Sequence, residues 1–179
     1  EIIMGHSFRP WEGAEARISG QYKIALLELA KKDIAAGDYS KAEEKLEKAL
    51  VYPENLGEGK LEGTKDNNIY YYLGTVKEAL GKEGAKECFE LAELGENEPA
   101  GAMYYYDQPA DMILYKGLAK QKIGKTKEAF ACFNKLMDYG ERHLNDKVKN
   151  DFFAVSLPDF LIFEDDMDRR NKAHCYYLM

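Results

Sequence analysis

Residues 27–50 read LELAKKDIAAGDYSKAEEKLEKAL and divide at Gly37 into two stretches of helix-forming residues. Ala30 and Ala42, one on each side of the glycine, are small residues of the kind found where two helices cross closely. Leu46 follows Ala42 by one helical turn and lies on the same face of the second helix. Because glycine readily adopts the backbone conformation that ends a helix, the segment predicts a helical hairpin that turns at Gly37.

The same template occurs twice more in the chain. Residues 71–92 read YYLGTVKEALGKEGAKECFELA, and residues 114–136 read LYKGLAKQKIGKTKEAFACFNKL. Each copy has a small residue in the first helix, a glycine at the turn, and then an alanine and a large apolar residue in the second helix. These three matches predict an array of helical repeats. The matching positions are Ala30, Gly37, Ala42 and Leu46; Gly74, Gly81, Ala85 and Phe89; and Gly117, Gly124, Ala129 and Phe133.

At these positions the chain resembles the tetratricopeptide repeat (TPR) family over roughly residues 19–140. The glycine-to-alanine spacing is one residue shorter in the second copy than in the other two. The resemblance implies an all-α fold, a TPR-like right-handed solenoid of antiparallel helix pairs. We expect residues 1–18 to form a loop segment before three hairpins in residues 19–140, and residues 141–179 to form a capping segment and the start of a further repeat.

Each repeat is longer than a plain TPR unit. The equivalent small residues Ala30, Gly74 and Gly117 are 44 and 43 residues apart, whereas a TPR unit has about 34 residues. The extra residues, about ten per repeat, fall in a first insertion at 53–66, PENLGEGKLEGTKD, and a second insertion at 95–108, GENEPAGAMYYYDQ. Because insertions at the same point of each unit project from one side of a solenoid, we expect the two to lie together.

A carboxylate recurs at comparable positions ahead of the repeats. The segment AEARISG at 14–20 echoes GEGKLEG at 57–63, and YYYDQP at 104–109 stands at a similar distance before the third small residue. Glu15, Glu58 and Asp107 are the carboxylates concerned. One interpretation is that they cap the free N–H groups of a helix N-terminus.

The alternative interpretation is a shared polar and aromatic groove that suits a sugar. Carboxylates and amides would pair with the sugar hydroxyls, and a tryptophan or tyrosine ring would stack on the apolar face of the sugar. In a catalytic version, two of the acids Glu12, Glu15, Glu58, Asp107 and Asp159 would serve as acid and base, or as nucleophile, at one glycosidic bond. The candidate ligand-binding residues are Trp11, Glu12, Glu15, Tyr52, Asn55, Glu58, Lys60, Tyr105, Asp107, Gln108 and Asp159.

Four segments resemble the TPR-containing C-terminal region of large bacterial proteins that carry an uncharacterised, β-rich N-terminal domain. They are WEGAEAR, YPENLGEGK, YYYDQPAD and FAVSLPDFLIFEDD. The resemblance implies a carbohydrate-linked role for the parent protein. We expect the chain to be a non-catalytic piece of such a protein, an interaction module for a protein partner or for another domain of its parent. A carbohydrate-binding or glycoside-processing element and a purely structural spacer are the alternatives.

The charged residues, histidines and cysteines of the sequence indicate which partners, cofactors and cellular location to expect. With 32 acidic and 25 basic residues the formal net charge is −7, which disfavours nucleic acid and anionic membranes as partners. The histidines match no metal-binding motif and the sequence has no cofactor-binding motif, so we predict no metal and no cofactor. The three cysteines form no disulfide pattern, so we expect a reducing, cytoplasmic location, with Cys88 and Cys132 as buried thiols.

The C-terminal part of the chain departs from the template. We expect the aromatic side chains of residues 146–166, DKVKNDFFAVSLPDFLIFEDD, to pack over the end of the array. From Met167 onward, MDRRNKAHCYYLM predicts the first helix of a fourth unit that lacks its partner helix. An apolar end face of this kind favours a homodimer.

Overall fold

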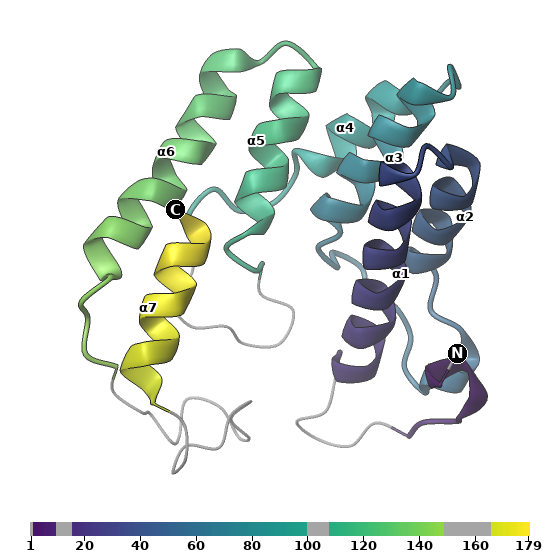
Figure 1. Ribbon diagram of the computed structural model, residues 1–179, viewed down its shortest axis with the longest axis horizontal. Coiled ribbons are helices and arrows are strands. Elements are labelled where there is room, and N and C mark those ends of the chain that lie inside the picture. The colour runs from purple at the N-terminus through teal and green to yellow at the C-terminus, as the bar shows by residue number, and fades with distance from the viewer. Residues whose placement is uncertain (1, 10–15, 100–107, 149–165) are drawn as a thin grey trace.

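A computed structural model gives the structure of residues 2–9, 16–99, 108–148 and 166–179 (Figure 1). These residues form α-helices and short 3₁₀ turns, and no β-strand is present among them. The all-α class predicted from the sequence is therefore confirmed for the described part of the chain. The α-helices are α1 (Arg17–Ala35), α2 (Tyr39–Ala49), α3 (Asn67–Ala79), α4 (Ala85–Ala92), α5 (Met112–Lys122), α6 (Thr126–His143) and α7 (Met167–Leu178), and the 3₁₀ turns are η1 (Ile3–Gly5) and η2 (Glu54–Leu56).

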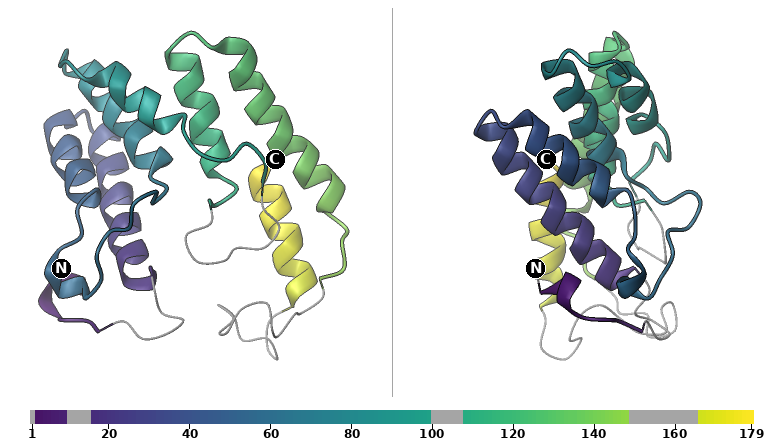
Figure 2. Two further views of the ribbon diagram at one scale, coloured as in Figure 1. Left: turned by 180° about the vertical axis from the view of Figure 1, so that it is seen from behind. Right: turned by 90° about the vertical axis from the view of Figure 1, so that its right-hand side faces the viewer.

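The helices α1 to α6 form three consecutive antiparallel pairs. α1 packs on α2, α3 packs on α4, and α5 packs on α6, and these are the most extensive contacts between helices. Neighbouring pairs also touch, through α2 with α3 and through both α3 and α4 with α5. Figure 2 shows the pairs in chain order, with α7 lying along the C-terminal half of α6. The arrangement gives each pair contacts mainly with the pairs next to it.

A glycine follows the first helix of every pair, as the repeat template predicts. Gly37, Gly81 and Gly124 have φ angles of 80°, 64° and 83°, in the left-handed region that glycine adopts without strain. The residue after each glycine donates its N–H to the carbonyl five residues earlier, the bond of a Schellman motif, so all three hairpins turn in the same way. These bonds join Asp38 to Asp33 (2.8 Å), Lys82 to Lys77 (2.9 Å) and Lys125 to Lys120 (2.8 Å).

The small residue of the first helix lies against the large apolar residue of the second. A Cβ atom added to Gly117 would lie 2.3 Å from the Phe133 ring, and one added to Gly74 would lie 2.7 Å from the Phe89 ring. Ala30, the equivalent residue of α1, is fully buried. The small residues therefore set how closely the two helices of each pair approach.

The core is a row of three clusters rather than one centre. The first surrounds Leu46 between α1, α2 and α3, the next surrounds Phe89 between α3, α4 and α5, and the last surrounds Ile113 between α5, α6 and α7. Cys88 and Cys132 are buried free thiols in these clusters, as predicted. Burial raises the pKa of both thiols, so they remain protonated and pack as small apolar residues.

The ends of the described chain agree only in part with the sequence prediction. α7 begins at Met167, as expected, whereas α1 begins at Arg17, two residues before the predicted start of the repeats. Residues 149–165, which we expected to pack over the end of the array, lie outside the described residues. None of the helices in the described part of the chain combines the length and the apolar run that crossing a bilayer requires.

Candidate functional site

Glu58, in the first insertion, caps helix α1. Its carboxylate accepts hydrogen bonds from the backbone N–H groups of Ala16 (2.8 Å) and Ser19 (3.2 Å). N–H groups in the first turn have no partner within a helix, and the positive end of the helix dipole favours a negative charge beside them. Glu58 thus caps a helix N-terminus, but not that of the helix that follows it in the chain, which is the one that the capping interpretation expects. The helix that it caps belongs to the preceding repeat, not to the repeat that follows it.

Lys60 and Lys23 hold the buried carboxylate of Asp66. The Asp66 side chain is 1% exposed, and its two oxygens each lie 2.6 Å from a lysine Nζ, one from Lys23 and one from Lys60. Lys60 also donates to the Leu50 carbonyl at 3.0 Å. Burying a carboxylate is costly unless it is paired, and two ammonium groups offset that cost here. The network ties α1 and the first insertion to the start of α3.

Asn55 and Tyr52 also contact their own chain. The Asn55 side-chain amide donates to the carbonyls of Ile3 (3.0 Å) and His6 (2.9 Å), and the Asn55 backbone carbonyl accepts from the N–H of Phe8 at 2.8 Å. Tyr52 is half-buried, and burial raises the pKa of its phenol. Asn55 thereby fastens η1 to η2, at the start of the first insertion.

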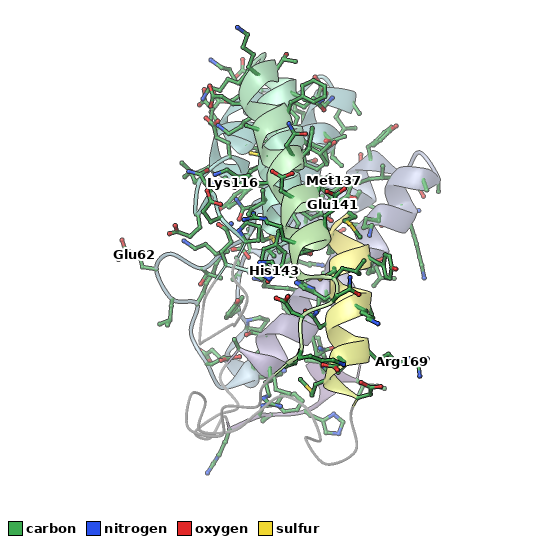
Figure 3. The ribbon with its side chains drawn as sticks, turned by 90° about the vertical axis from the view of Figure 1, so that its left-hand side faces the viewer. Glu62, Lys116, Met137, Glu141, His143 and Arg169 are labelled. Atoms are coloured by element: carbon green, nitrogen blue, oxygen red, sulfur yellow. The ribbon has the colours of Figure 1, made fainter. Side chains whose placement is uncertain are left out.

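The base of the second insertion is held by Gln108 and Lys116. Gln108 accepts from the Glu96 N–H (2.9 Å) and donates to the Glu96 carbonyl (3.0 Å). Lys116, on α5 and labelled in Figure 3, is 1% exposed. Its Nζ donates to the carbonyls of Gly95 (2.5 Å) and Glu96 (2.7 Å) and to Oδ1 of Asn97 (3.1 Å). Burial lowers the pKa of Lys116, and three acceptors match the three N–H groups of an ammonium ion.

The remaining candidate residues of the sugar groove lie outside the described residues. The structure therefore places Tyr52, Asn55, Glu58 and Lys60 in or beside the first insertion, and Gln108 at the base of the second. Their gathering around one sugar, and an acid–base pair among the carboxylates, stay predictions. The residues outside the described part are Trp11, Glu12, Glu15, Tyr105, Asp107 and Asp159.

A shallow pocket of about 270 Å³ lies between the end of the first insertion and the start of the second. Asn67, in its wall, already donates to the carbonyls of Ala92 (2.8 Å) and Leu94 (2.7 Å). The bases of the two insertions are thus side by side, as expected. The residues that line the pocket include Lys65, Asn67 and Tyr70 on one side and Leu91, Leu94 and Gly95 on the other.

A second surface is formed by α1, α3, α5 and α7, on the sides of these helices that turn away from α2, α4 and α6. α3 contacts both α1 and α5, and Figure 1 shows α7 on the side of α5 that is away from α3. Tyr177 is 68% exposed here. Ile24 precedes Glu28 by four residues and Leu114 follows Asp111 by three, so helical spacing places them on the same sides of α1 and α5, and they are 54% and 39% exposed. We call this surface the inner face and define it by Ile24, Glu28, Lys31, Tyr72, Asp111, Leu114, Tyr115 and Tyr177.

Contacts between helices join the polar and aromatic residues of the inner face. The Tyr72 and Tyr115 rings lie 5.9 Å apart between centroids, and Tyr71 lies 6.0 Å from Tyr115. The Tyr177 hydroxyl donates to Oδ2 of Asp111 at 3.2 Å. Aromatic rings thus join α3 to α5, and a hydrogen bond joins α7 to Asp111 at the start of α5.

The pKa values of two tyrosines report the same neighbourhood. Burial raises the pKa of Tyr115, and the neighbouring Tyr72, Tyr177 and Asp111 raise it further. Burial is also the largest cause of the raised pKa of Tyr177. The Asp111 carboxylate raises this pKa further, and Glu28 and Tyr72 have smaller effects in the same direction. Glu28 on α1 is thus near enough to act on Tyr177 on α7, and both phenols are neutral hydrogen-bond donors at physiological pH.

Sequence reasoning did not identify the inner face. The run Tyr70-Tyr71-Tyr72 was the one available signal, because three adjacent helical positions do not all face the core. Its neighbours Tyr115 and Tyr177 come from later helices that only the folded chain brings near. Lys116 was missed for another reason. It occupies the position at which the other two repeats have Leu29 and Leu73, so the repeat pattern predicts an apolar residue there.

Among the residues that the structure describes, no three histidine, cysteine or carboxylate side chains cluster so as to hold a metal ion. No protein-family model matches the chain, and no solved structure matches it.

Proposed function

We propose that the chain is a TPR-like, right-handed helical solenoid that acts as an interaction module. Its partner is a protein segment or another domain of a larger parent protein. The proposal is supported by the repeated hairpin, in which the same glycine turn and the same contact between a small and a large residue recur. In such arrays each repeat adds one strip to an extended binding surface.

The observation that carries the proposal is the exposure of large apolar and aromatic side chains along the inner face. Ile24, Leu114 and Tyr177 lie on three different helices and are each more than one third accessible. Apolar side chains gathered on one surface and flanked by charged groups mark interaction sites in soluble proteins. On the loop side, the surface formed by the two insertions, the described polar candidates instead bind neighbouring parts of their own chain.

A selection from a displayed peptide library, carried out with the whole chain, tests the proposal. The selected peptides are then measured by fluorescence anisotropy against the chain and against the Leu114→Glu variant. Leu91→Glu is the matched control, because Leu91 on α4 is 43% exposed and Leu114 is 39% exposed, yet Leu91 lies at the pocket between the insertions. We expect the peptides to bind the chain and the control alike, and to lose affinity by about tenfold or more for Leu114→Glu, as when a charge is buried unpaired at an interface.

Two outcomes would contradict the interaction module. Failure to enrich any peptide would remove the basis for a binding surface and favour the structural spacer. Peptides whose affinity falls for Leu91→Glu and not for Leu114→Glu would move the binding site to the loop side. Circular dichroism of both variants establishes that either loss of binding is not a loss of helix.

A carbohydrate-binding element remains the alternative, and the pocket between the insertions favours it. An aromatic ring, Tyr70, stands there beside the polar side chains of Lys65 and Asn67, a combination that suits a sugar ring. Calorimetry with a panel of mono- and oligosaccharides, on the chain and on Lys65→Ala, tests this alternative. Saturable binding that is weakened in the variant would support it, and no binding to any sugar in the panel would remove it.

A further inference from the structure

The inner face gathers aromatic rings and carboxylates from four separate helices. Tyr72 and Tyr115 pack with ring centroids 5.9 Å apart, and the Tyr177 hydroxyl binds the Asp111 carboxylate at 3.2 Å. The charge of Glu28, on α1, also acts on the Tyr177 phenol and raises its pKa. Because neighbours in sequence supply none of these contacts, the cluster exists only in the folded array.

The charges of this cluster favour a cation. Asp111 accepts its hydrogen bond from a neutral phenol. Glu28 is paired with Lys31 at 2.7 Å, in an exposed pair of the kind that contributes little. Arg170 lies on the same side of α7 as Tyr177, but it is two helical turns, about 10 Å, nearer the start of the helix and is not counted with the cluster. Asp111 and Glu28 thus outnumber Lys31 around the tyrosines.

Tyrosine rings add to the attraction for a cation. The face of an aromatic ring carries negative potential and binds an ammonium or guanidinium group within about 6 Å of its centre. A guanidinium is the better fit of the two, because it stacks flat on a ring while it donates in a fork to a carboxylate. The formal net charge of −7 adds a long-range attraction for a basic segment.

We propose that the cluster of Tyr72, Tyr115, Tyr177, Asp111 and Glu28 binds an arginine side chain of a basic partner peptide. The inference rests on the proposed interaction module and names the chemistry of its partner. The guanidinium stacks on the exposed Tyr177 ring, beside the partly buried rings of Tyr72 and Tyr115, and donates to the carboxylates. An acidic peptide is disfavoured at this cluster, because its negative charges are repelled by the carboxylates of Asp111 and Glu28.

The test uses a small probe with a neutral twin. Nα-acetyl-arginine methylamide and the corresponding citrulline compound, which has the same shape without the charge, are titrated separately into the ¹⁵N-labelled chain and followed by NMR. We expect saturable shifts at the amides of Tyr72, Asp111, Tyr115 and Tyr177 with the arginine compound. The citrulline compound should bind about two- to fivefold more weakly or not at all.

Variants separate the contributions of ring and charge. Asp111→Asn and Tyr177→Ala should each weaken the arginine compound by about two- to fivefold. Tyr177→Phe keeps the ring, loses the bond to Asp111, and should retain most of the affinity. Tyr176→Ala is the matched control, because Tyr176 is 64% exposed beside Tyr177, which is 68% exposed, and belongs to another side of α7. It should bind as the unmodified chain does.

Equal binding of the two compounds, shifts confined to another surface, or affinity that Asp111→Asn leaves unchanged would each overturn the inference. These results are distinct from failure of the interaction module. If library peptides bind the inner face but are neutral or acidic, and the arginine compound does not bind, the module stands and its cationic preference falls. If the arginine compound binds as described while no peptide is enriched, the subsite stands without the wider module.

Discussion

At the scale of single residues, Glu58 holds the start of α1 although it lies 42 residues after Ala16, which it binds. We expect Glu58→Ala to lower the free energy of unfolding by about 0.5–2 kcal/mol, the usual cost of losing a helix cap. Urea denaturation measures the difference. Glu62→Ala is the control, because Glu62 belongs to the same insertion and projects outward from it (Figure 3). Equal losses in both variants would mean that Glu58 contributes no cap.

Glu93, at the end of α4, predicts a stability that depends on pH. Burial by itself would raise its pKa, but hydrogen bonds from Lys125 (2.5 Å) and Lys120 (3.0 Å) outweigh burial and lower the pKa. A carboxylate with a lower pKa in the folded state stabilises the fold above its unfolded pKa, about 4.3, and loses that contribution as the pH falls through the folded pKa. Glu93→Gln should therefore cost about 1 kcal/mol at pH 7 and progressively less below about pH 4.

The measurement for Glu93 is urea denaturation of the chain and the variant between pH 7 and pH 3.5. Glu90→Gln is the control on the same helix, because Glu90 pairs with Lys86 at 3.4 Å in a solvent-exposed setting. It should have little effect at any pH. A cost of Glu93→Gln that stays constant over the whole range would show that the carboxylate charge does not stabilise the fold.

At the scale of the elements, the spacing within each helix pair depends on one small residue. Gly117→Ala would place a Cβ atom 2.3 Å from the Phe133 ring, so the ring or the helix must move. We expect a loss of about 1–3 kcal/mol, as for other overpacked sites. Gly20→Ala is the same change inside α1, where the added Cβ meets nothing within 4 Å, and it should be neutral or stabilising by about 0.5–1 kcal/mol.

Thermal denaturation of these two alanine variants gives the comparison. The combination of Gly117→Ala with Phe133→Leu should recover part of the loss, because the smaller side chain makes room for the new methyl group. Similar melting temperatures for Gly117→Ala and Gly20→Ala would contradict the close contact. Circular dichroism at low temperature controls for a change in helix content.

The elements could be predicted from the sequence because their signals are local. A glycine after an amphipathic stretch ends a helix wherever it occurs, and a small residue opposite a large one is readable from spacing within one hairpin. The sequence could not predict which helix Glu58 caps. Spacing along the chain places Glu58 just before the second repeat and so pointed to the helix that follows it. The fold brings it instead to the N-terminus of α1.

The inner face belongs to the scale of the whole molecule. Tyr72, Tyr115 and Tyr177 belong to no common sequence motif. In the sequence, each of them is only one aromatic residue of its own helix. The stacking of α3, α5 and α7 brings them to a common surface, so only the assembled array reveals them. On the loop side, only the carboxylates Glu15, Glu58 and Asp107 were found because they recur in sequence. The candidates that the structure describes have contacts within the chain that account for much of their polarity.

The row of three core clusters predicts that the two ends of the molecule open separately. Ile113 and Ile69 are 0% and 1% exposed and belong to different clusters, between α5 and α7 and between α1 and α3. Ile113→Val and Ile69→Val remove one methylene each, at an expected cost of about 0.5–1.5 kcal/mol. In an array with contacts mainly between neighbours, that cost falls first on the nearest units.

Hydrogen exchange followed by mass spectrometry makes the comparison. Ile113→Val should speed exchange in α5, α6 and α7 and leave α1 and α2 close to their original protection, whereas Ile69→Val should do the reverse. The two variants control for each other, since they remove the same atoms from equally buried sites. Uniform acceleration along the whole chain in both would mean that the helices open as one cooperative unit, and the row of clusters would then have no energetic counterpart.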